Sequence, residues 1–326
     1  MTQDVTGLDV TGLGVTALAG GVGAARMLAG LSSVIGQGSI TAVVNTGDDT
    51  VLHGLHVSPD IDTVTYTLAG VSNSVTGWGL AGETWGVMEA LASFDPSLTW
   101  FRLGDRDLAT HLYRTGRLAE GISLSQVTGE VCRRFGVGAA LLPMSDDRVE
   151  TRVTLENGQE VGFQEYFVGL AHSVPVKAVR FAGAEDASPA PGVLKAIEGT
   201  GLLVICPSNP VVSIGPVLAV PGVAEAVARR RETTVAVSPI IAGKALKGPA
   251  DHMLAELGFE PSAAGVAAMW APYAGTIVVD NADAALAGRI EALGVRCVVA
   301  PSVMSSPAEA AKLAESVLGA GLGAAT

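Results

Sequence analysis

Four aspartates follow the second predicted strand, residues 40–44, closely enough to form one site. Asp48 and Asp49 come directly after this strand, and Asp60 and Asp62 follow just before a predicted helix. In an open α/β sheet the ligand crevice lies beyond the carboxyl ends of the strands, so Asp48 or Asp49 should point into it. Hard cations such as Mg²⁺ prefer one or two carboxylates together with substrate phosphates. Helix capping and turn formation are the alternative roles, but capping accounts for one acidic residue and not for four.

A glycine-rich turn follows the first predicted strand, residues 15–19. It contains Gly20, Gly21 and Gly23 immediately before a predicted helix. Glycines allow the backbone to bend sharply there, and the N–H groups at the start of a helix can bind a phosphate. Many turns of this kind serve chain geometry alone, so the motif by itself is weak support for nucleotide binding. A site for a nicotinamide cofactor is a weaker interpretation still. Such a site uses a single acidic residue at the end of the second strand to bind the ribose, whereas the acidic residues here come as a pair.

Two polar loops follow later predicted strands, at residues 207–216 and 238–244. The first loop combines prolines with small polar residues that are candidates for nucleotide binding: Ser208, Asn209, Ser213 and Gly215. In the second, Lys244 can supply positive charge, as can Lys247 just after it. Because both loops should face the same edge of the sheet, together they predict a nucleotide site.

Residues 103–111 place two acids, an arginine and a histidine around a glycine turn that opens a helix. The candidates for substrate binding in this segment are Asp105, Arg106 and His111. Arginine is suited to bidentate contacts with phosphates and to stacking on planar rings. The alternative is that Asp105 or Asp107 caps the helix and that Arg106 is an ordinary surface residue.

Zinc and disulfide chemistry are poorly supported. His53 and His56 are three residues apart, but no third nitrogen or sulfur ligand follows nearby. Cys132, Cys206 and Cys297 are far apart and form no Cys-x-x-Cys pair, so we predict reduced, buried thiols of a cytoplasmic protein.

The elements that position these residues follow the pattern of a doubly wound α/β fold. A strand, a glycine turn and a helix at 24–31 lead into strand 40–44, which predicts a βαβ unit with a right-handed crossover. Four short apolar strands come later in the chain, at 202–206, 234–237, 276–279 and 296–300. Helices are predicted at 223–231, 250–257, 282–293 and 307–318. We therefore predict one Rossmann-like, mostly parallel sheet with helices on both faces.

Two segments interrupt this pattern. From about 63 to 140 the apolar spacing indicates amphipathic helices, so we predict a mainly helical insertion. A β-hairpin section at about 150–170 is indicated by Asn157-Gly158 between alternating runs at 151–155 and 161–167. The predicted organisation is a disordered tail, residues 1–14, followed by a single domain, residues 15–326.

Composition limits the class of protein. The net charge of -12 argues against a nucleic-acid surface, because such surfaces gather Lys and Arg. The mean hydropathy is +0.42, but no apolar stretch reaches the length of about 20 residues that a bilayer requires. We predict a cytoplasmic enzyme without a membrane partner, and we assign the hydrophobicity to buried parallel strands.

In order along the chain, these segments resemble the family that transfers 2-phospholactate or phosphoenolpyruvate to the deazaflavin Fo in coenzyme F(420) biosynthesis. The matching motifs are Gly-Gly-Val-Gly at 20–23, Asn-Thr-Gly-Asp-Asp at 45–49, Pro-Asp-Ile-Asp-Thr at 59–63, Leu-Gly-Asp-Arg-Asp-Leu-Ala-Thr-His at 103–111, Pro-Met-Ser-Asp-Asp at 143–147, Pro-Ser-Asn-Pro at 207–210, Ser-Ile-Gly-Pro at 213–216 and Ser-Pro-Ile-Ile at 238–241. They span nearly the whole chain, and the segments from 103 and 207 are the most specific.

The resemblance implies a donor made of guanosine diphosphate esterified to a small acid, with Fo as acceptor and GMP as leaving group. It implies that Asp48 and Asp62 are catalytic and bind Mg²⁺, and that Asp62 and Arg106 meet the deazaflavin. Asp105 and His111 are assigned to the same substrate. The loops with Ser208, Asn209, Ser213 and Gly215, together with the glycine turn, would hold the guanine nucleotide. A homodimer is also implied.

The first glycine turn departs from many relatives, which carry Gly-Gly-Thr-Gly. The Val22 version with Arg26 looks more like the actinobacterial members, which points to an enolpyruvyl donor. The lactyl and glyceryl donors stay open, as does the use of a general base. The alternatives are a non-catalytic nucleotide-sugar-binding regulator with a related fold and an NAD-dependent dehydrogenase.

Overall fold

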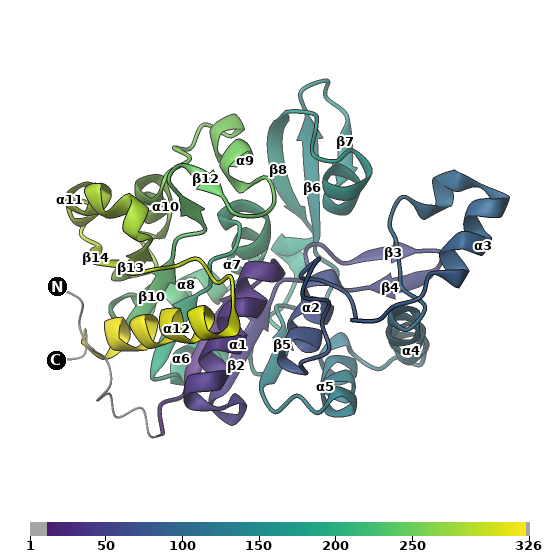
Figure 1. Cartoon of the computed structure of the whole chain (residues 1–326), viewed down its shortest axis with the longest axis horizontal. Helices are drawn as coiled ribbons and strands as arrows, with labels where there is room; N and C mark the ends of the chain where they lie inside the picture. Colours follow the sequence, from purple (N-terminus) through teal and green to yellow (C-terminus); the bar gives the residue numbers. More distant parts are fainter. Residues whose placement is uncertain (1–11, 324–326) are drawn as a thin grey trace.

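The computed structural model describes residues 12–323, so residues 1–11 of the predicted tail lie outside the described part of the chain. Its centre is a seven-stranded sheet in which every pairing is parallel. In spatial order the strands are β14 (Arg296–Val299), β13 (Thr276–Val279), β10 (Thr234–Val237), β9 (Leu202–Ile205), β1 (Val15–Ala19), β2 (Ile40–Val44) and β5 (Ala140–Pro143). The predicted Rossmann-like α/β fold is confirmed (Figure 1).

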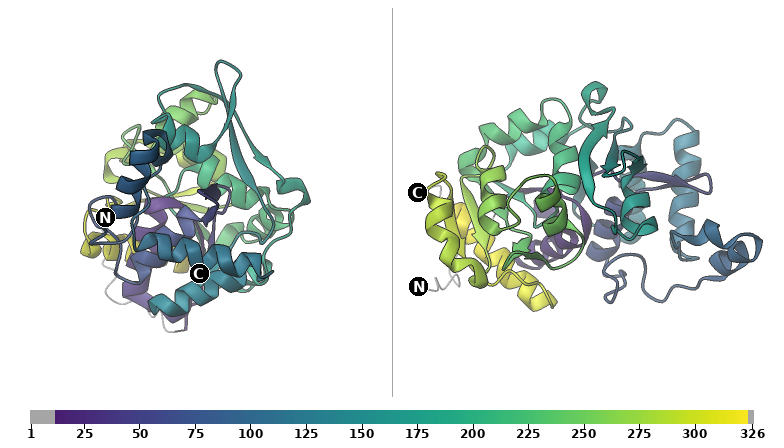
Figure 2. Two further views of the ribbon diagram at one scale, coloured as in Figure 1. Left: turned by 90° about the vertical axis from the view of Figure 1, so that its right-hand side faces the viewer. Right: turned by 90° about the horizontal axis from the view of Figure 1, so that it is seen from above.

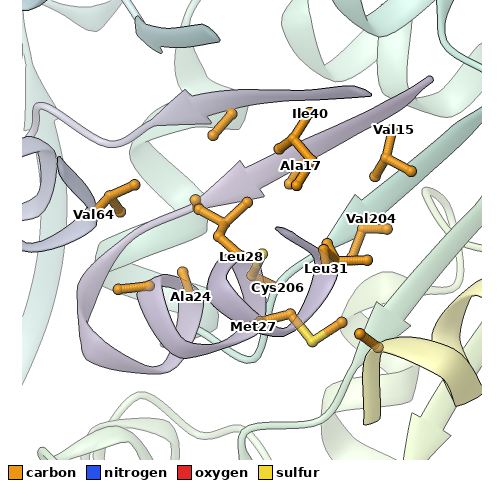
Figure 3. Packing of buried hydrophobic residues seen from close by; sticks show 14 of the residues in the cluster. Val15, Ala17, Ala24, Met27, Leu28, Leu31, Ile40, Val64, Val204 and Cys206 are labelled. Atoms are coloured by element: carbon orange, nitrogen blue, oxygen red, sulfur yellow. The ribbon is translucent and has the colours of Figure 1, made fainter. Parts of the chain in front are cut away.

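Both faces of the sheet are buried, and alternate residues of each strand belong to different cores. Val15 and Ala17 of β1 pack in one hydrophobic cluster, whereas Leu18 packs in the other. Figure 3 shows the first cluster, where Leu28 of α1 lies toward Ala17 of β1 and Met27 lies near Cys206. This two-residue alternation follows from the pleat, and it explains why the strands are almost uniformly apolar.

Helices cover the two faces. Those contributing to the first cluster are α1 (Gly21–Ile35), α2 (Pro59–Leu68), α5 (Leu124–Phe135) and α12 (Pro307–Leu322). Those contributing to the second are α6 (Val193–Gly199), α7 (Gly215–Ala219), α8 (Val223–Arg229), α9 (Ala250–Glu256), α10 (Ala263–Trp270) and α11 (Ala287–Glu291). Although they come from opposite ends of the chain, α1 and α12 lie side by side (Figure 1).

The strand order reverses between β1 and β9. From β1 the chain builds outward through β2 and β5, and it then returns to the other side of β1 to build β9, β10, β13 and β14. Such a reversal opens a crevice at the carboxyl ends of the two central strands, which is the usual ligand position in this fold class.

Strand β5 was not predicted. It pairs in parallel with β2 directly after the helices of the insertion, with Leu142 opposite Val43. Its residues directly follow the amphipathic helices of the insertion, and they continue an apolar pattern that suits a helix equally well.

The helical insertion contains α2, α3 (Gly86–Phe94), α4 (Asp107–Ala119) and α5. Just before it, β3 (Thr50–Leu52) and β4 (Leu55–Val57) form a hairpin that the sequence did not predict. His53 lies in the turn of this hairpin with a positive φ of 53°. Each strand of the hairpin has only three residues, so no alternation could be seen in the sequence.

The predicted β-hairpin at 151–167 is confirmed only in its first part. Strands β6 (Glu150–Leu155) and β7 (Glu160–Gly162) pair, but residues Glu165–Gly169 form a π-helical turn instead of continuing β7. The third strand, β8 (Val176–Ala182), pairs with the other edge of β6 and was missed. Figure 2 (right) shows this small sheet between the insertion and the C-terminal half of the chain.

Two predicted helices begin or end differently. The first starts at Gly21, inside the glycine turn, and runs to Ile35. The segment predicted at 282–293 starts as a 3-10 helix, Asn281–Leu286, before α11.

Within residues 12–323, no single helix is long and apolar enough to cross a membrane, and one bent helix pair passes that test by length and composition only.

Candidate active site

A cavity of about 490 Å³ lies at the carboxyl ends of the central strands. Its walls come from the glycine turn after β1, the loop after β2, the start of α2, the loop after β9 and the loop after β10. The insertion and the small antiparallel sheet add further walls from helix α4 and from the π-helical turn. These elements meet at the reversal of strand order, where a ligand site is expected.

Most of the predicted site residues line this cavity: Gly20, Gly21, Gly23, Asp48, Asp62, His111, Ser208, Asn209 and Ser213. Three predicted residues, Asp105, Arg106 and Gly215, are not among its lining residues. Gly215 instead begins α7, and a Cβ there would lie 2.8 Å from the ring of Phe181.

The glycine turn is tied to the loop after β9. The Ser208 hydroxyl donates to the carbonyl oxygen of Gly20 at 2.8 Å, and the Asn209 side chain accepts from the backbone N–H of Val211 at 2.9 Å. The backbone N–H of Gly21 donates to Asp60 Oδ1 at 2.8 Å. These bonds fix the N-terminus of α1 at the cavity beside the loop after β9, and because Asp60 takes the Gly21 N–H, the N–H groups that follow Gly21 are the ones that can bind phosphate.

Gly23 is expected to tolerate no side chain. A Cβ at this position would lie 2.3 Å from the carbonyl oxygen of Pro207, and a backbone atom cannot swing away as a flexible side chain can. Gly23→Ala should therefore lower the free energy of unfolding by about 1–3 kcal/mol, the usual cost of overpacking. Chemical denaturation measures this loss. Gly38→Ala is the matched control, because a Cβ there meets nothing within 4 Å; equal losses in both variants would contradict the close approach.

Three carboxylates gather beside the glycine turn: Asp48 and Asp60, which are buried, and Asp49, which is half-buried. Burial, followed by the negative charge of Asp60, raises the pKa of Asp48 well above its usual value. Burial likewise raises the pKa of Asp49, whose Oδ2 accepts from the Ser58 hydroxyl at 2.6 Å. The pKa of Asp60 rises to about 6 through burial, although Asn45 and Gly21 donate to its oxygens. Carboxylates with such raised pKa values are typical of sites that bind a cation or transfer a proton.

Asp62 forms an ion pair with Arg114, whose side chain is fully buried. Arg114 Nη1 donates to Asp62 Oδ2 at 3.0 Å, and Nη2 donates to Oδ1. Burial acts to lower the pKa of Arg114, but the Asp62 carboxylate outweighs this effect and raises it. Arg114 therefore stays charged and fixes the orientation of the Asp62 carboxylate by a two-pronged contact.

His111 lies between two carboxylates. Its Nδ1 is 3.7 Å from Asp62 Oδ2, and its Nε2 is 3.4 Å from Asp107 Oδ2. Arg114 Nη1 lies 3.3 Å from Nδ1 and can only donate, so Nδ1 is the acceptor in that contact and Nε2 is the ring nitrogen that faces Asp107. The Tyr66 hydroxyl donates to Asp107 Oδ1 at 2.6 Å.

Two positions fit a metal ion. The ligand atoms of Asp62, Asp107 and His111 all lie within 4.8 Å of one another, so this group can hold one. Asp48 is the second: it lines the cavity, is buried, and its Oδ1 has no hydrogen-bond partner in the described chain. An oxygen-only site suits a hard cation, and the unpartnered Asp48 oxygen fits it better than Asp62, both oxygens of which contact Arg114.

Asp105 and Arg106 stabilise the insertion. The carboxylate of Asp105 accepts from the backbone N–H groups of Gly86 and Val87 at 2.9 and 3.0 Å, at the start of α3. The Arg106 side chain is exposed and donates to the carbonyl oxygen of Ala81 at 2.7 Å. The capping role that the sequence left open is thus what Asp105 performs, for α3 and not for α4.

Sequence reasoning missed Arg114 and the aromatic wall of the cavity. Arg114 had a detectable signal, because Asp107, His111 and Arg114 are spaced four and three residues apart and so share one face of α4. Phe163 and Phe167 line the cavity as stacked rings 5.6 Å apart, and Trp78 and Phe101 line it as well. Nothing local marks these aromatic residues, which come from separate segments.

A profile of the family described as 2-phospho-L-lactate transferase CofD matches residues 15–296. The chain is 48% identical over 307 residues to a phosphoenolpyruvate transferase from Kitasatospora aureofaciens, covering 93% of this chain and 96% of the relative. It is 41% identical over 306 residues to the protein of that name from Mycolicibacterium smegmatis, covering 90% and 94%.

Among solved structures, the chain resembles a member of the UPF0052 family from Bacillus halodurans. The TM-score is 0.59 at 19% identity, over 96% of this chain and 100% of that one. At this identity the likeness supports the fold alone.

Proposed function

Because this chain belongs to the family of the 2-phospho-L-lactate transferase CofD, we propose that it transfers a phosphoenolpyruvyl group from a guanosine-diphosphate-activated donor to the deazaflavin Fo. The terminal hydroxyl of Fo attacks the phosphorus that bears the acid, the bond to GMP breaks, and dehydro coenzyme F(420)-0 forms. The 2-phospholactyl donor is the alternative. The observation that carries the proposal is one cavity that joins a phosphate-binding turn, buried carboxylates and an aromatic wall.

The nucleotide is proposed to bind along the glycine turn and the loop after β9. Gly20, Gly21 and Gly23 bring the N-terminus of α1 to the cavity, and Ser208, Asn209 and Ser213 face it from the neighbouring strand. Backbone N–H groups at a helix start favour the negative charge of a phosphate. Gly215 lies outside the cavity lining, and we assign it to the shape of this loop.

The acceptor is proposed to bind against the insertion and the small antiparallel sheet. The Phe163 and Phe167 rings and Trp78 offer apolar faces on which a planar deazaflavin can stack. Asp62 and His111, held by Arg114 and Asp107, are then placed to orient its polar groups.

Asp48 and Asp62 are the proposed catalytic carboxylates, and Mg²⁺ is the proposed cofactor, with Asp48 as its main protein ligand. When bound, Mg²⁺ would neutralise negative charge on the donor phosphates. The protein supplies the remaining effects: it holds both substrates in one cavity, and its apolar walls keep water away from the reacting phosphorus.

The test is a reconstituted reaction with Fo and each guanylated acid, followed by chromatography of the fluorescent product. Turnover with the enolpyruvyl donor, dependent on Mg²⁺ and accompanied by GMP release, is the expected result. Fluorescence titration with Fo, with and without Mg²⁺ and GDP, precedes it and should show saturable binding. A protein that binds nucleotide sugar but catalyses no transfer would instead be the non-catalytic regulator.

Arg106→Ala is expected to raise the KM for Fo several-fold while leaving the KM for the donor within about twofold. Arg106 holds the carbonyl of Ala81, in the segment that carries Trp78 into the cavity wall, so we propose that it acts at the acceptor end. Steady-state kinetics with each substrate varied in turn measures both constants. A rise in the KM for the donor alone would contradict this proposal and would mean that Arg106 acts at the nucleotide end of the cavity.

We also propose a homodimer in the cytoplasm. The three cysteines are free thiols, which suits a reducing compartment. The insertion exposes large apolar side chains, with Phe94 85% exposed, which suits burial in a subunit interface. Sedimentation analysis tests the dimer.

A further inference from the structure

Lys247 lies at the mouth of the cavity, where several separate segments of the chain meet. It follows β12 (Lys244–Ala245), lines the cavity and donates from Nζ to the carbonyl oxygen of Thr76 at 3.0 Å. The next residue, Gly248, lies beside the aromatic wall, because a Cβ there would be 3.9 Å from the ring of Phe167. The ammonium group thus lies at the edge of the site, in contact with the segment that contains Thr76.

The same ammonium group lies close to the first turn of α1. A Cβ on Gly77 would be 2.7 Å from the side chain of Val22 and 3.2 Å from Lys247 Nζ. The Val22 side chain and the Lys247 ammonium group therefore both lie next to Gly77. Arg26, one turn after Val22 on α1, also lines the cavity and uses Nη1 to bind the carbonyl oxygen of Met304 at 3.1 Å. Two side-chain cations and the positive end of a helix therefore face the same part of the cavity.

No carboxylate of residues 12–323 forms an ion pair with Lys247 or Arg26, although the chain as a whole has a net charge of -12. Lys244, only three residues away, does pair with Asp251 at 3.4 Å. Burial, together with the positive charge of Arg26, lowers the pKa of Lys247. Two neighbouring cations without a counter-charge are stabilised by an anion from outside the protein.

We propose that Lys247, supported by Arg26, binds the phosphate oxygens of the donor and so selects a diphosphate-containing nucleotide over an uncharged nucleoside. An ammonium group has three N–H donors and Thr76 takes one, so two can bind the anion without displacing the segment that carries Trp78. This inference rests on the proposed function in taking the donor to be a nucleoside diphosphate derivative.

The test is calorimetric titration of the full chain at fixed Mg²⁺ with three probes: GDP, guanosine and inorganic pyrophosphate. Lys247→Gln should weaken the binding of GDP and of pyrophosphate about tenfold, which is the scale of one exposed charge-assisted hydrogen bond. The affinity for guanosine should not change. Lys244→Gln is the matched control and should stay within about twofold of the wild type for every probe.

The outcomes separate this inference from the proposed function. Unchanged GDP and pyrophosphate binding in Lys247→Gln would overturn the inference, and so would an equal loss for guanosine, which would mean that Lys247 only shapes the loop. If the wild type binds pyrophosphate in a Lys247-dependent way but does not bind GDP, the inference stands and the guanylated donor is wrong.

Discussion

Replacing Asp48 by asparagine is expected to lower kcat about 100- to 1,000-fold and, at the same time, to raise the melting temperature of the metal-free protein. The Asp48 carboxylate is buried, its Oδ1 has no partner among the described residues, and Asp60 and Asp49 lie near it. A buried charge beside like charges destabilises the folded state, and a neutral amide of the same shape removes that cost. Such a carboxylate is retained at the expense of stability, which is characteristic of functional sites.

Calorimetric melting in a chelator and steady-state kinetics measure the two effects. We expect a rise of about 1–2 °C in the melting temperature, which corresponds to about 1 kcal/mol in a chain of this size. Adding Mg²⁺ should stabilise the wild type but not Asp48→Asn, because the proposed ligand is gone.

Asp49→Asn is the matched control for Asp48→Asn. Asp49 is the adjacent carboxylate and is half-buried; its Oδ2 accepts from Ser58, its Oδ1 has no partner among the described residues, and it is not among the residues that line the cavity. The Asp49→Asn variant should retain most of the activity of the wild type and most of its stabilisation by Mg²⁺. If Asp48→Asn keeps kcat within about fivefold of the wild type, Asp48 is not a catalytic residue.

The second large effect is expected from Arg114→Met. Methionine fills a similar volume but leaves the buried Asp62 carboxylate without its cation, and removal of one partner of a buried pair costs about 3–5 kcal/mol. Denaturant unfolding should show this loss, and the kcat of the remaining folded protein should fall because nothing fixes the Asp62 carboxylate.

The double variant Arg114→Met with Asp62→Asn tests this reason. Because it removes both charges, it should recover at least half of the lost stability, while activity stays low. Arg117→Met, on the same helix but in a more exposed ion pair with Glu130, should cost much less stability than Arg114→Met, because solvent screens exposed pairs. A double variant as unstable as Arg114→Met would show that the arginine acts through packing and not through its charge.

Much of the site was visible in the sequence because its signals are local. The glycine turn, the aspartates after β2 and the polar loop after β9 each follow a short apolar strand, and in a parallel sheet all such positions share one edge. The resemblance to a transferase family drew on these same segments, and the family profile spans them.

Elements were missed where a short segment is compatible with more than one secondary structure. β5 continues the apolar pattern of the helices before it, the strands of the β3–β4 hairpin are too short for alternation to show, and β7 ends shortly before a π-helical turn. Asp105 could have capped either neighbouring helix, and only the folded insertion places it at the start of α3.

What the sequence by itself determined was therefore the parallel sheet, its glycine turn and most residues that line the cavity, since strand periodicity and turn chemistry depend on near neighbours. The tertiary structure alone decided which charges meet. Asp62 and Arg114 are 52 residues apart, and they pair because α2 and α4 bring them together in a buried space where an unpaired charge would be costly. The same packing leaves Asp48 Oδ1 without a hydrogen-bond partner among residues 12–323, and it leaves Arg106 outside the cavity wall.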